Sequence, residues 1–232
     1  MEHRDIKWFP LDRIDDLQQA ISRMITHSSE VTARYGLCCA LGLHGLRVSE
    51  ISRALSKHFE PLNRSLYVLP YDPKGGTCRP LKHGVPRTVK LHPSLVDAIM
   101  YWRGQRELYR TNRWLLPNRR GNATKPQEIS ARGGELLIEL GSMEDASTRF
   151  HMLRHTYAMR LLAETNDICL VSKQLGHSNI QTTMVYAHSL KEVPAECLVK
   201  IYAQASAVPV AGQQLMLFNP FDSPAQGTSA TA

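Results

Sequence analysis

Residues 150–188 read FHMLRHTYAMRLLAETNDICLVSKQLGHSNIQTTMVYAH, and the rest of the chain is best understood from this stretch. Four of its side chains are candidates for chemistry: His151, Arg154, His177 and Tyr186. The first two lie three residues apart, so on a helix they share one face. A second apolar helical pattern, a Gly-His turn and a segment that Ser178 or Asn179 can cap then lead to the tyrosine. This order can bring two hydrogen-bond donors and a phenol to one point in space.

These residue types indicate chemistry on a phosphate. The fixed fork of arginine donors suits a phosphate, and histidine can add a hydrogen bond or a proton. Positive surroundings favour a phenolate, whose unperturbed pKa is about 10, so a tyrosine hydroxyl in their midst can attack phosphorus. A lone His-x-x-Arg is more often a solvated helix face, and a lone tyrosine is more often part of a core. Residues elsewhere in the chain must therefore distinguish phosphate chemistry from these structural roles.

Two strings in this stretch, HMLRHTYA at 151–158 and LGHSNIQTTMVYAH at 175–188, resemble the second half of the tyrosine recombinase (phage integrase) catalytic domain. That family carries Arg, Lys, His-x-x-Arg, His or Trp, and Tyr in this order. The spacings from Arg154 to His177 and from His177 to Tyr186 match it. The resemblance also implies an upstream arginine in a Gly-Leu-Arg-x-Ser-Glu turn, which is present at residues 45–50, and a lysine in a β-hairpin.

The resemblance makes Arg47 the first of two arginines that grip the scissile phosphate, with Arg154 the second. Arg47 stands at the first turn of a predicted helix, just after a Gly-Leu pair. A simple ion pair with Glu50, three residues on, is the alternative and contributes only a few tenths of a kcal/mol. Under the resemblance, Glu50 orients Arg47 or another basic group.

Residues 65–91 are predicted to form a β-hairpin, because the segments 65–70 and 85–91 are rich in β-formers and bounded by Pro and Gly. The resemblance implies a catalytic lysine in this hairpin. Lys74 is our first choice, Lys82 is the alternative, and Lys90 comes third.

Helical spacing of apolar residues predicts several further helices. They cover residues 11–25, 30–43, 46–56, 92–109, 126–140 and 191–205. Together with the hairpin they predict a mostly α-helical α+β protein. The resemblance implies the catalytic (DNA breaking-rejoining) fold of the tyrosine recombinases, with a small antiparallel β-hairpin or sheet.

The resemblance covers about residues 11–190 and implies one catalytic domain over 1–205. Residues 206–232, rich in Ala, Pro, Gln, Gly and Ser, form a flexible tail by composition. Its apolar segment 215–218 is a candidate for docking on a partner or neighbouring subunit. Only 46 residues precede Arg47. We therefore expect either a compact, single-domain member of the family without a separate N-terminal DNA-clamping domain, or a truncated or partnered one.

The composition fits a polyanionic partner without proving one. Lys and Arg outnumber Asp and Glu by 28 to 21, which gives a net charge of +7 and a pI near 9.3. The loop over 110–125 is basic and carries one tryptophan, so it is a candidate phosphate-contacting surface, although an ordinary exposed loop explains it equally well. No apolar run approaches the ~20 residues of a membrane span. Five cysteines without a C-x-x-C pair favour a reduced, cytoplasmic protein.

The resemblance implies a site-specific recombinase or integrase of a mobile genetic element. It cleaves and rejoins DNA through a 3′-phosphotyrosyl link, with neither a metal nor a cofactor. Its partners are double-stranded DNA, three further copies in a tetramer on two paired sites, and in some systems an accessory DNA-binding protein. The implied catalytic residues are Arg47, Lys74 as general acid, His151 on the tyrosine proton or the phosphate, Arg154, His177 on a non-bridging oxygen, and Tyr186. His155 is expected to face elsewhere on its helix and to give support only.

Three other functions would also use some of these residues. A type IB topoisomerase shares the tyrosine and the basic residues, but the small size and the string from 175 to 186 favour a recombinase. A non-catalytic DNA-binding regulator that kept the fold is the second, and the filled catalytic positions argue against it. A metal hydrolase built on His151 and His155 lacks the acidic residue of a His-Glu-x-x-His motif.

Overall fold

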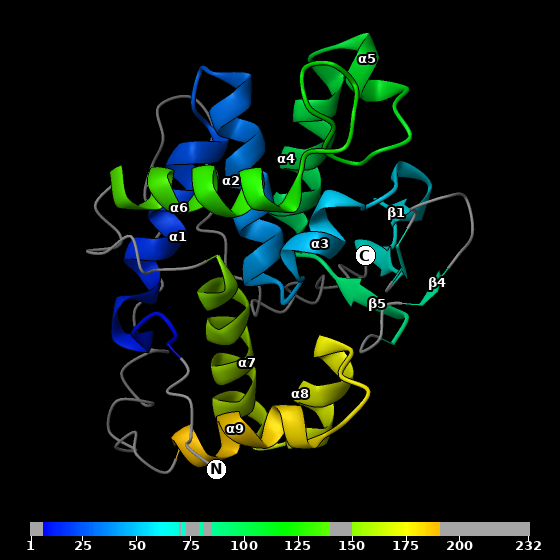
Figure 1. The fold of residues 1–232 in the computed structure, drawn as a ribbon. Helices are drawn as coiled ribbons and strands as arrows, with labels where there is room; N and C mark the ends of the chain where they lie inside the picture. Colours follow the sequence, from blue (N-terminus) through cyan, green and yellow to red (C-terminus); the bar gives the residue numbers. More distant parts are fainter. Residues whose placement is uncertain (1–6, 70, 73–78, 81–84, 140–149, 191–232) are drawn as a thin grey trace, which may run out of the picture.

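A computed structural model describes residues 7–69, 71–72, 79–80, 85–139 and 150–190. In this part of the chain, helices pack around one another and against a small sheet at one side (Figure 1). The helices are α1 (Ile14–Ile25), α2 (Glu30–Leu43), α3 (Val48–Ser52), α4 (Pro93–Gly104), α5 (Glu107–Arg110), α6 (Pro126–Glu139), α7 (His151–Thr165), α8 (Ile168–Leu175) and α9 (Gln181–Leu190). The prediction of a mostly helical α+β protein is confirmed. None of the described helices is both long and apolar enough to cross a bilayer.

The predicted hairpin is confirmed, with shorter strands than expected. Strand β2 (Ser65–Val68) pairs antiparallel with β5 (Arg87–Lys90), and β1 (Phe59–Glu60) pairs with the other edge of β2. A two-stranded extension, β3 (Tyr71–Asp72) with β4 (Arg79–Pro80), continues the hairpin outward. Side chains alternate along β5, so that Arg87 and Val89 are buried while Thr88 and Lys90 are exposed. An arginine therefore points inward from the strand.

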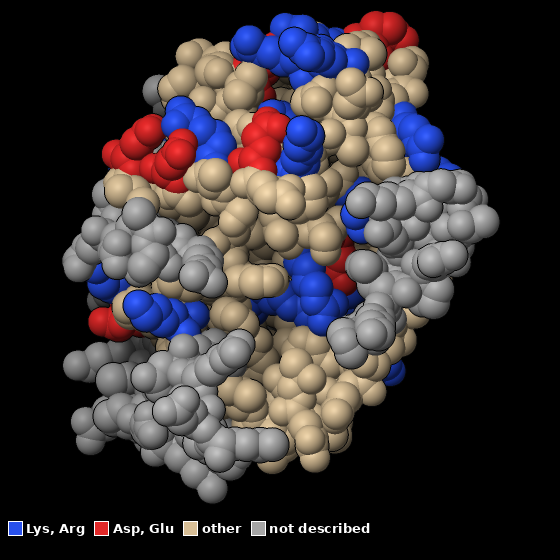
Figure 2. Space-filling view, viewed as in Figure 1, with Lys and Arg blue, Asp and Glu red and all other residues tan. Residues whose placement is uncertain are grey.

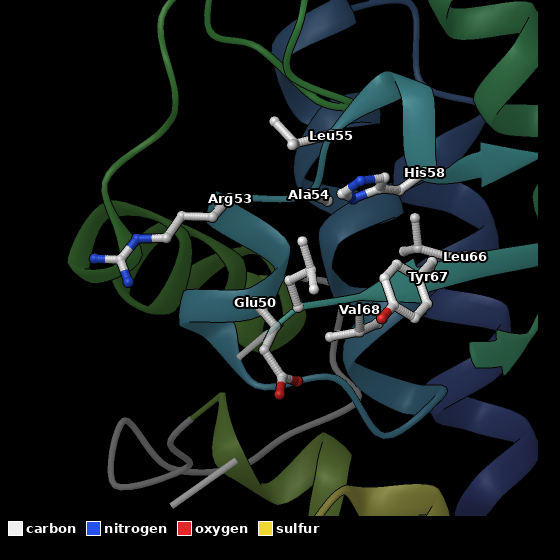
Figure 3. A pocket seen from close by; sticks show the side chains of 9 residues that line it. Glu50, Arg53, Ala54, Leu55, His58, Leu66, Tyr67 and Val68 are labelled. Atoms are coloured by element: carbon white, nitrogen blue, oxygen red, sulfur yellow. The ribbon is translucent and has the colours of Figure 1, made fainter. Parts of the chain in front are cut away.

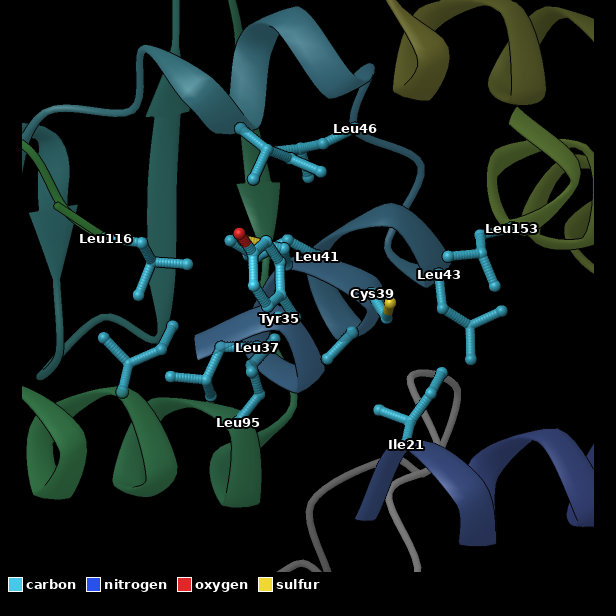
Figure 4. Close-up of a cluster of buried hydrophobic side chains, with 14 of the residues drawn as sticks. Ile21, Tyr35, Leu37, Cys39, Leu41, Leu43, Leu46, Leu95, Leu116 and Leu153 are labelled. Carbon is cyan, nitrogen blue, oxygen red and sulfur yellow. The ribbon is translucent and has the colours of Figure 1, made fainter. Parts of the chain in front are cut away.

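Helix α2 is the centre of the main core. Its N-cap Ser29 accepts a hydrogen bond from the Thr32 amide, and every residue from 33 to 43 is buried. A Cβ on Gly36 would lie 2.7 Å from the Cβ of Met24, so glycine allows α1 to approach α2 closely. Apolar side chains from α1, α4 and α7 surround α2, including Ile21, Leu95 and Leu153 (Figure 4).

The predicted helix over 92–109 is broken into two. Arg106 is extended, with φ −143° and ψ 139°, and separates α4 from α5. In a continuous helix, Trp102 and Tyr109 would be about 10 Å apart along the axis. With the break, their rings stack at 4.4 Å between centroids, at an interplanar angle of 8°. The aromatic contact therefore accounts for the break.

Helix α3 is shorter than the predicted 46–56. After Ser52, the chain leaves the helix and pairs with the loop over 112–115, where the Leu115 amide donates to the Ala54 carbonyl at 2.8 Å and Leu55 forms a β-bridge with Trp114. These long-range hydrogen bonds replace those of another helical turn.

Helices α7, α8 and α9 form the lower part of the molecule in Figure 1. Asn166 (φ 51°) ends α7 and Gly176 (φ 65°) ends α8, both in the left-handed conformation that such ends favour. Asn179 accepts from the Gln181 amide at the start of α9, one of the two predicted caps. Tyr186 lies in the middle of α9 rather than at the end of its segment, where the sequence placed it. The predicted helix over 191–205 and the tail over 206–232 lie outside the described residues.

Candidate active site

The site is built around the carboxylate of Glu50, at the start of α3. The Arg47 amide donates to Glu50 Oε2 at 2.7 Å, and Arg47 Nη1 contacts Oε1 at 3.2 Å. The Glu50 side chain therefore caps the start of its own helix. Arg154 Nη1, from α7, lies 3.7 Å from Oε2. Arg47 and Arg154, more than a hundred residues apart in sequence, thus meet at one acid. The contact between Glu50 and Arg47 is the one that both the resemblance and the simple ion pair predict.

Arg87 is a third arginine on Glu50, and sequence reasoning missed it. Its Nη1 and Nη2 reach Oε1 and Oε2, each at 2.9 Å, in a bidentate pair. Burial alone raises the pKa of the Glu50 carboxyl, but the hydrogen bonds and charge of Arg87, with the charge of Arg154, outweigh it and lower that pKa to about 2. The one signal in the sequence is an arginine at an inward position of a strand.

Arg154 donates hydrogen bonds to backbone carbonyls of two other segments. It is buried, and it donates to the carbonyl of Gly45, after α2, and to that of Leu175, at the end of α8, the latter at 2.7 Å. Burial and the charge of Arg47 lower its pKa to about 9. One guanidinium therefore joins the end of α2, α7 and the α8–α9 turn.

His177 lies beside Arg154, as the sequence predicts. Its Nε2 is 3.1 Å from Arg154 Nη2, and its Nδ1 is 2.8 Å from the Thr183 hydroxyl. Because a guanidinium can only donate, Nε2 must accept, and the ring proton then sits on Nδ1 and is donated to Thr183. Burial, together with the charges of Arg154 and Arg47, lowers the pKa of His177 to about 3. The ring is therefore neutral at neutral pH.

Tyr186 faces His155 and not solvent. Its side chain is 3% exposed and packs with Ala158, Met159 and other apolar residues of α7 and α8. Its hydroxyl forms a 2.7 Å hydrogen bond with Nδ1 of His155. Burial raises the pKa of the phenol, while the charges of Arg154 and Arg47 act in the opposite direction. The positive charges of Arg154 and Arg47 therefore both favour the ionised form of Tyr186.

The expectation that His155 faces elsewhere is wrong. It follows His151 by four residues, so on α7 the two rings lie side by side, with centroids 5.9 Å apart. Burial and the charges of His151 and Arg154 lower the pKa of His155 to about 4, so it is neutral and in contact with the phenol. His151 itself is exposed at the first position of α7, and desolvation and the Arg154 charge lower its pKa.

Of the three candidate lysines, the structure describes one, Lys90. Lys74 and Lys82 both lie outside the described part of the chain. Lys90, the third choice, is exposed on β5, and its Nζ donates to the Asn63 carbonyl at 3.2 Å.

Two hollows adjoin the cluster that Glu50 forms with Arg47, Arg87 and Arg154. A cavity of about 20 Å³ lies behind Glu50, between α3 and β2, and the Glu50 carboxylate points away from Arg53 and His58, which help to line it (Figure 3). A groove of about 580 Å³ lies between β5 and α8 and is lined by Arg87, Lys173 and His177 among others. Basic side chains also occupy the middle of the face seen in Figure 2, at the level where α3 and β5 meet α7 and α8.

Chemically, this cluster suits a phosphate. Three guanidinium groups against one carboxylate leave two positive charges beside a neutral histidine and a phenol. A dianionic transition state at phosphorus needs charge of this kind, supplied by fixed donors. In the described part of the chain, no group of three His, Cys, Asp or Glu side chains is close enough to hold a metal ion.

Comparison with known proteins places the chain in a family. The phage integrase family model matches residues 7–193, most of the chain. The chain belongs to the phage integrase family. Tyrosine recombinase XerD of Rhizobium meliloti is 33% identical over 107 residues, 46% of this chain and 34% of that protein. Tyrosine recombinase XerC of Pseudomonas putida is 32% identical over 148 residues, 62% and 44% of the two chains. This phage integrase family member thus spans between a third and a half of the length of these relatives.

Solved structures agree on the fold. The crystal structure of XerA recombinase superposes with a TM-score of 0.63 at 21% identity, and covers 86% of this chain and 65% of its own. XerH site-specific recombinase, in its post-cleavage complex with a palindromic difH substrate, gives a TM-score of 0.60 at 24% identity, with 76% and 48% covered. The predicted tyrosine recombinase catalytic fold is confirmed.

Proposed function

We propose that the protein is a site-specific DNA recombinase or integrase that cuts and rejoins DNA through a 3′-phosphotyrosyl intermediate. The observation that carries this proposal is the convergence of Arg47 and Arg154 on Glu50, within the electrostatic reach of a neutral His177 and the phenol of Tyr186. The catalytic unit covers about residues 11–190. The named relatives are tyrosine recombinases, which favours the same reaction class.

In the cleavage step, the Tyr186 oxygen attacks phosphorus, and the bond from phosphorus to the 5′-oxygen breaks. Arg47 and Arg154 bind the non-bridging oxygens and stabilise the charge that grows in the transition state, which is worth ~3–4 kcal/mol for each preorganised donor. A lysine of the hairpin loop, Lys74 or Lys82, gives its proton to the leaving 5′-oxygen. The phenol proton passes to His151, whose lowered pKa leaves it neutral.

Rejoining reverses these steps. A 5′-hydroxyl of another strand attacks phosphorus and gives its proton to the lysine, the bond from phosphorus to the tyrosine oxygen breaks, and the histidine returns a proton to the phenol. The ester to tyrosine conserves the energy of the phosphodiester, so neither a nucleotide nor a metal ion is needed. Two arginines take the place that a cation fills in other phosphoryl transfers.

The buried tyrosine implies a movement before cleavage. A phenol that is 3% exposed does not reach the phosphorus of a duplex, so Tyr186 must leave His155 and turn toward the arginines. DNA binding drives this change if the bound DNA interacts better with the released tyrosine than with the buried one. Recombination then requires double-stranded DNA and, with one tyrosine per cleaved strand, a tetramer on two sites. DNA as substrate also fits a cytoplasmic location.

The test is capture of a covalent adduct. The full-length protein is incubated with randomly nicked genomic DNA from its source organism, denatured, and purified with any DNA bound to it. We expect a protein–DNA adduct that Tyr186→Phe abolishes, and sequencing of the captured ends gives the recombination site. DNA binding without an adduct would leave the non-catalytic regulator in its place. Relaxation of a supercoiled plasmid without exchange between two sites would favour the topoisomerase.

A further inference from the structure

Arg87 is the buried arginine of the site to which the cleavage scheme gives no role. It is 8% exposed, lies on β5 and pairs with both oxygens of Glu50. Its Nη2 also lies 3.4 Å from the Gly45 carbonyl, which is an acceptor for Arg154 as well. Arg87 and Arg154 therefore share two partners, one acid and one carbonyl.

Arg87 also supports the turn that carries His177. A Cβ added to Gly176 would lie 2.8 Å from Arg87 Nη1, so the glycine backbone sits directly against the guanidinium. The Val85 amide, two residues before Arg87, donates to the Gly176 carbonyl at 3.3 Å. One side chain thus touches α3 through Glu50 and the α8–α9 turn through Gly176.

Three guanidinium groups compete for the two carboxylate oxygens of Glu50. The carboxylate has two oxygens, and Arg87 takes both at 2.9 Å, while Arg47 and Arg154 approach at 3.2 and 3.7 Å. A buried carboxylate without a bidentate partner is costly, so removing Arg87 would draw the other two guanidinium groups onto Glu50. Those are the groups that the cleavage scheme needs on the phosphate.

We propose that Arg87 is a positioning residue, which occupies Glu50 and supports the Gly176–His177 turn so that Arg47, Arg154 and His177 remain available to the scissile phosphate. This inference rests on the proposed DNA cleavage. Arg87 acts through its neighbours and does not itself touch the phosphate.

The test compares two substrates of different charge. The nicked duplex identified by adduct capture is prepared with either a phosphodiester or a methylphosphonate at the cleaved position. The methylphosphonate replaces a charged oxygen by a neutral methyl group, so arginine charge matters less. We expect Arg87→Met to slow adduct formation about 100-fold on the phosphodiester, the lower end of the range for losing one preorganised donor, and by less than about tenfold on the methylphosphonate.

Arg103→Met is the matched control. Arg103 is also 8% exposed, and it donates to the carbonyls of Trp114 and Leu115, away from Glu50. Its loss should lower Tm without changing the ratio of the two rates. Should Arg87→Met fail to fold, Arg87→Lys, which keeps a charge but cannot bridge both oxygens, takes its place, with the same drop in the ratio expected.

Three results would overturn the inference. Arg87→Met that forms the adduct as fast as the wild-type protein removes the role altogether. An equal slowing on both substrates assigns Arg87 to folding alone. A wild-type protein that forms no adduct overturns the proposed function, and this inference with it, whereas the first two results leave the proposed function intact.

Discussion

Single residues in this site are held by contacts from distant parts of the chain. Glu50 receives Arg47 from its own helix, Arg87 from β5 and Arg154 from α7. Removing one partner of a buried ion pair commonly costs ~3–5 kcal/mol, because the remaining charge is left uncompensated. Every arginine on Glu50 therefore contributes to stability as well as to the proposed chemistry. Variants at these positions need a readout that separates the two.

The hydrogen bond between His155 and Tyr186 can be tested by stability measurements in the absence of DNA. Their 2.7 Å hydrogen bond is buried, so His155→Phe leaves the Tyr186 hydroxyl without its partner, at a cost of ~1–3 kcal/mol. When Tyr186→Phe is already present, the same change should cost less, because no hydroxyl remains to be satisfied. We predict a coupling of about 1 kcal/mol or more between the two substitutions, measured by urea unfolding in a double-mutant cycle.

His151 is the control for that cycle. It neighbours His155 on α7, but its ring is exposed, and no hydrogen bond joins it to Tyr186 among the contacts of the described residues. His151→Phe and Tyr186→Phe should therefore be additive. Additivity of His155→Phe with Tyr186→Phe would contradict the hydrogen bond.

At the scale of helices and strands, local patterns predict much of what is observed. The cap and apolar spacing of α2 give its bounds at Glu30–Leu43, because nothing distant competes with its own hydrogen bonds. The break between α4 and α5 was not predicted. The stacking of Trp102 on Tyr109 stabilises the broken helix, and the helical spacing of apolar residues carries no information about this contact. The end of α3 was missed for the same reason, because its hydrogen bonds go to a loop some sixty residues later.

In the site, too, local motifs predict some residues, whereas long-range contacts determine others. A motif predicts Arg47, Arg154, His177 and Tyr186, because their spacing records a geometry already known in the family. Arg87 was missed, because a strand arginine is normally exposed and its partner Glu50 belongs to another element. His155 was misplaced, although its spacing of four from His151 puts both rings on one face of α7. Which lysine serves the reaction is a prediction that only the variants Lys74→Ala and Lys82→Ala can decide.

The turn between α8 and α9 should be intolerant of a side chain. Gly176 has φ 65°, and an added Cβ would lie 2.8 Å from Arg87 Nη1 and 3.0 Å from the Val85 carbonyl. We predict that Gly176→Ala destabilises the fold by ~1–2 kcal/mol through its left-handed backbone alone, and more if β5 has to shift. Thermal unfolding measures the loss.

Gly104→Ala, at the end of α4, is the matched substitution for Gly176→Ala. No atom lies within 4 Å of its added Cβ, and its φ is not in the left-handed range. Its Tm should stay the same or rise slightly, because alanine reduces the freedom of the unfolded chain. Equal Tm values for the two variants would contradict both the backbone strain at Gly176 and its close contact with β5.

Across the whole molecule, burial keeps several histidines neutral. The pKa values of His44 and His155 are lowered to about 4 and that of His177 to about 3, mainly by burial. In the unfolded chain a histidine titrates near 6.5. As pH falls below 6.5, the unfolded state binds protons that the folded state does not accept, so the free energy of unfolding decreases. Glu50, with a pKa of about 2, acts in the same direction at lower pH, below the usual range of a carboxyl.

The contribution of His44 to this pH dependence can be measured separately, because His44 lies outside the proposed active site. It is 1% exposed; its Nδ1 bonds the Ala40 carbonyl at 2.8 Å, and its Nε2 accepts from the His92 amide at 3.2 Å, so protonation of Nε2 breaks the link between α2 and the start of α4. Between pH 6.5 and 4, we predict that this residue alone removes about 1.4 kcal/mol of stability per pH unit. Urea unfolding at several pH values should give a slope smaller by that amount in His44→Gln, even if the variant is less stable at pH 7.5. A slope unchanged in His44→Gln would mean that His44 is protonated equally in both states.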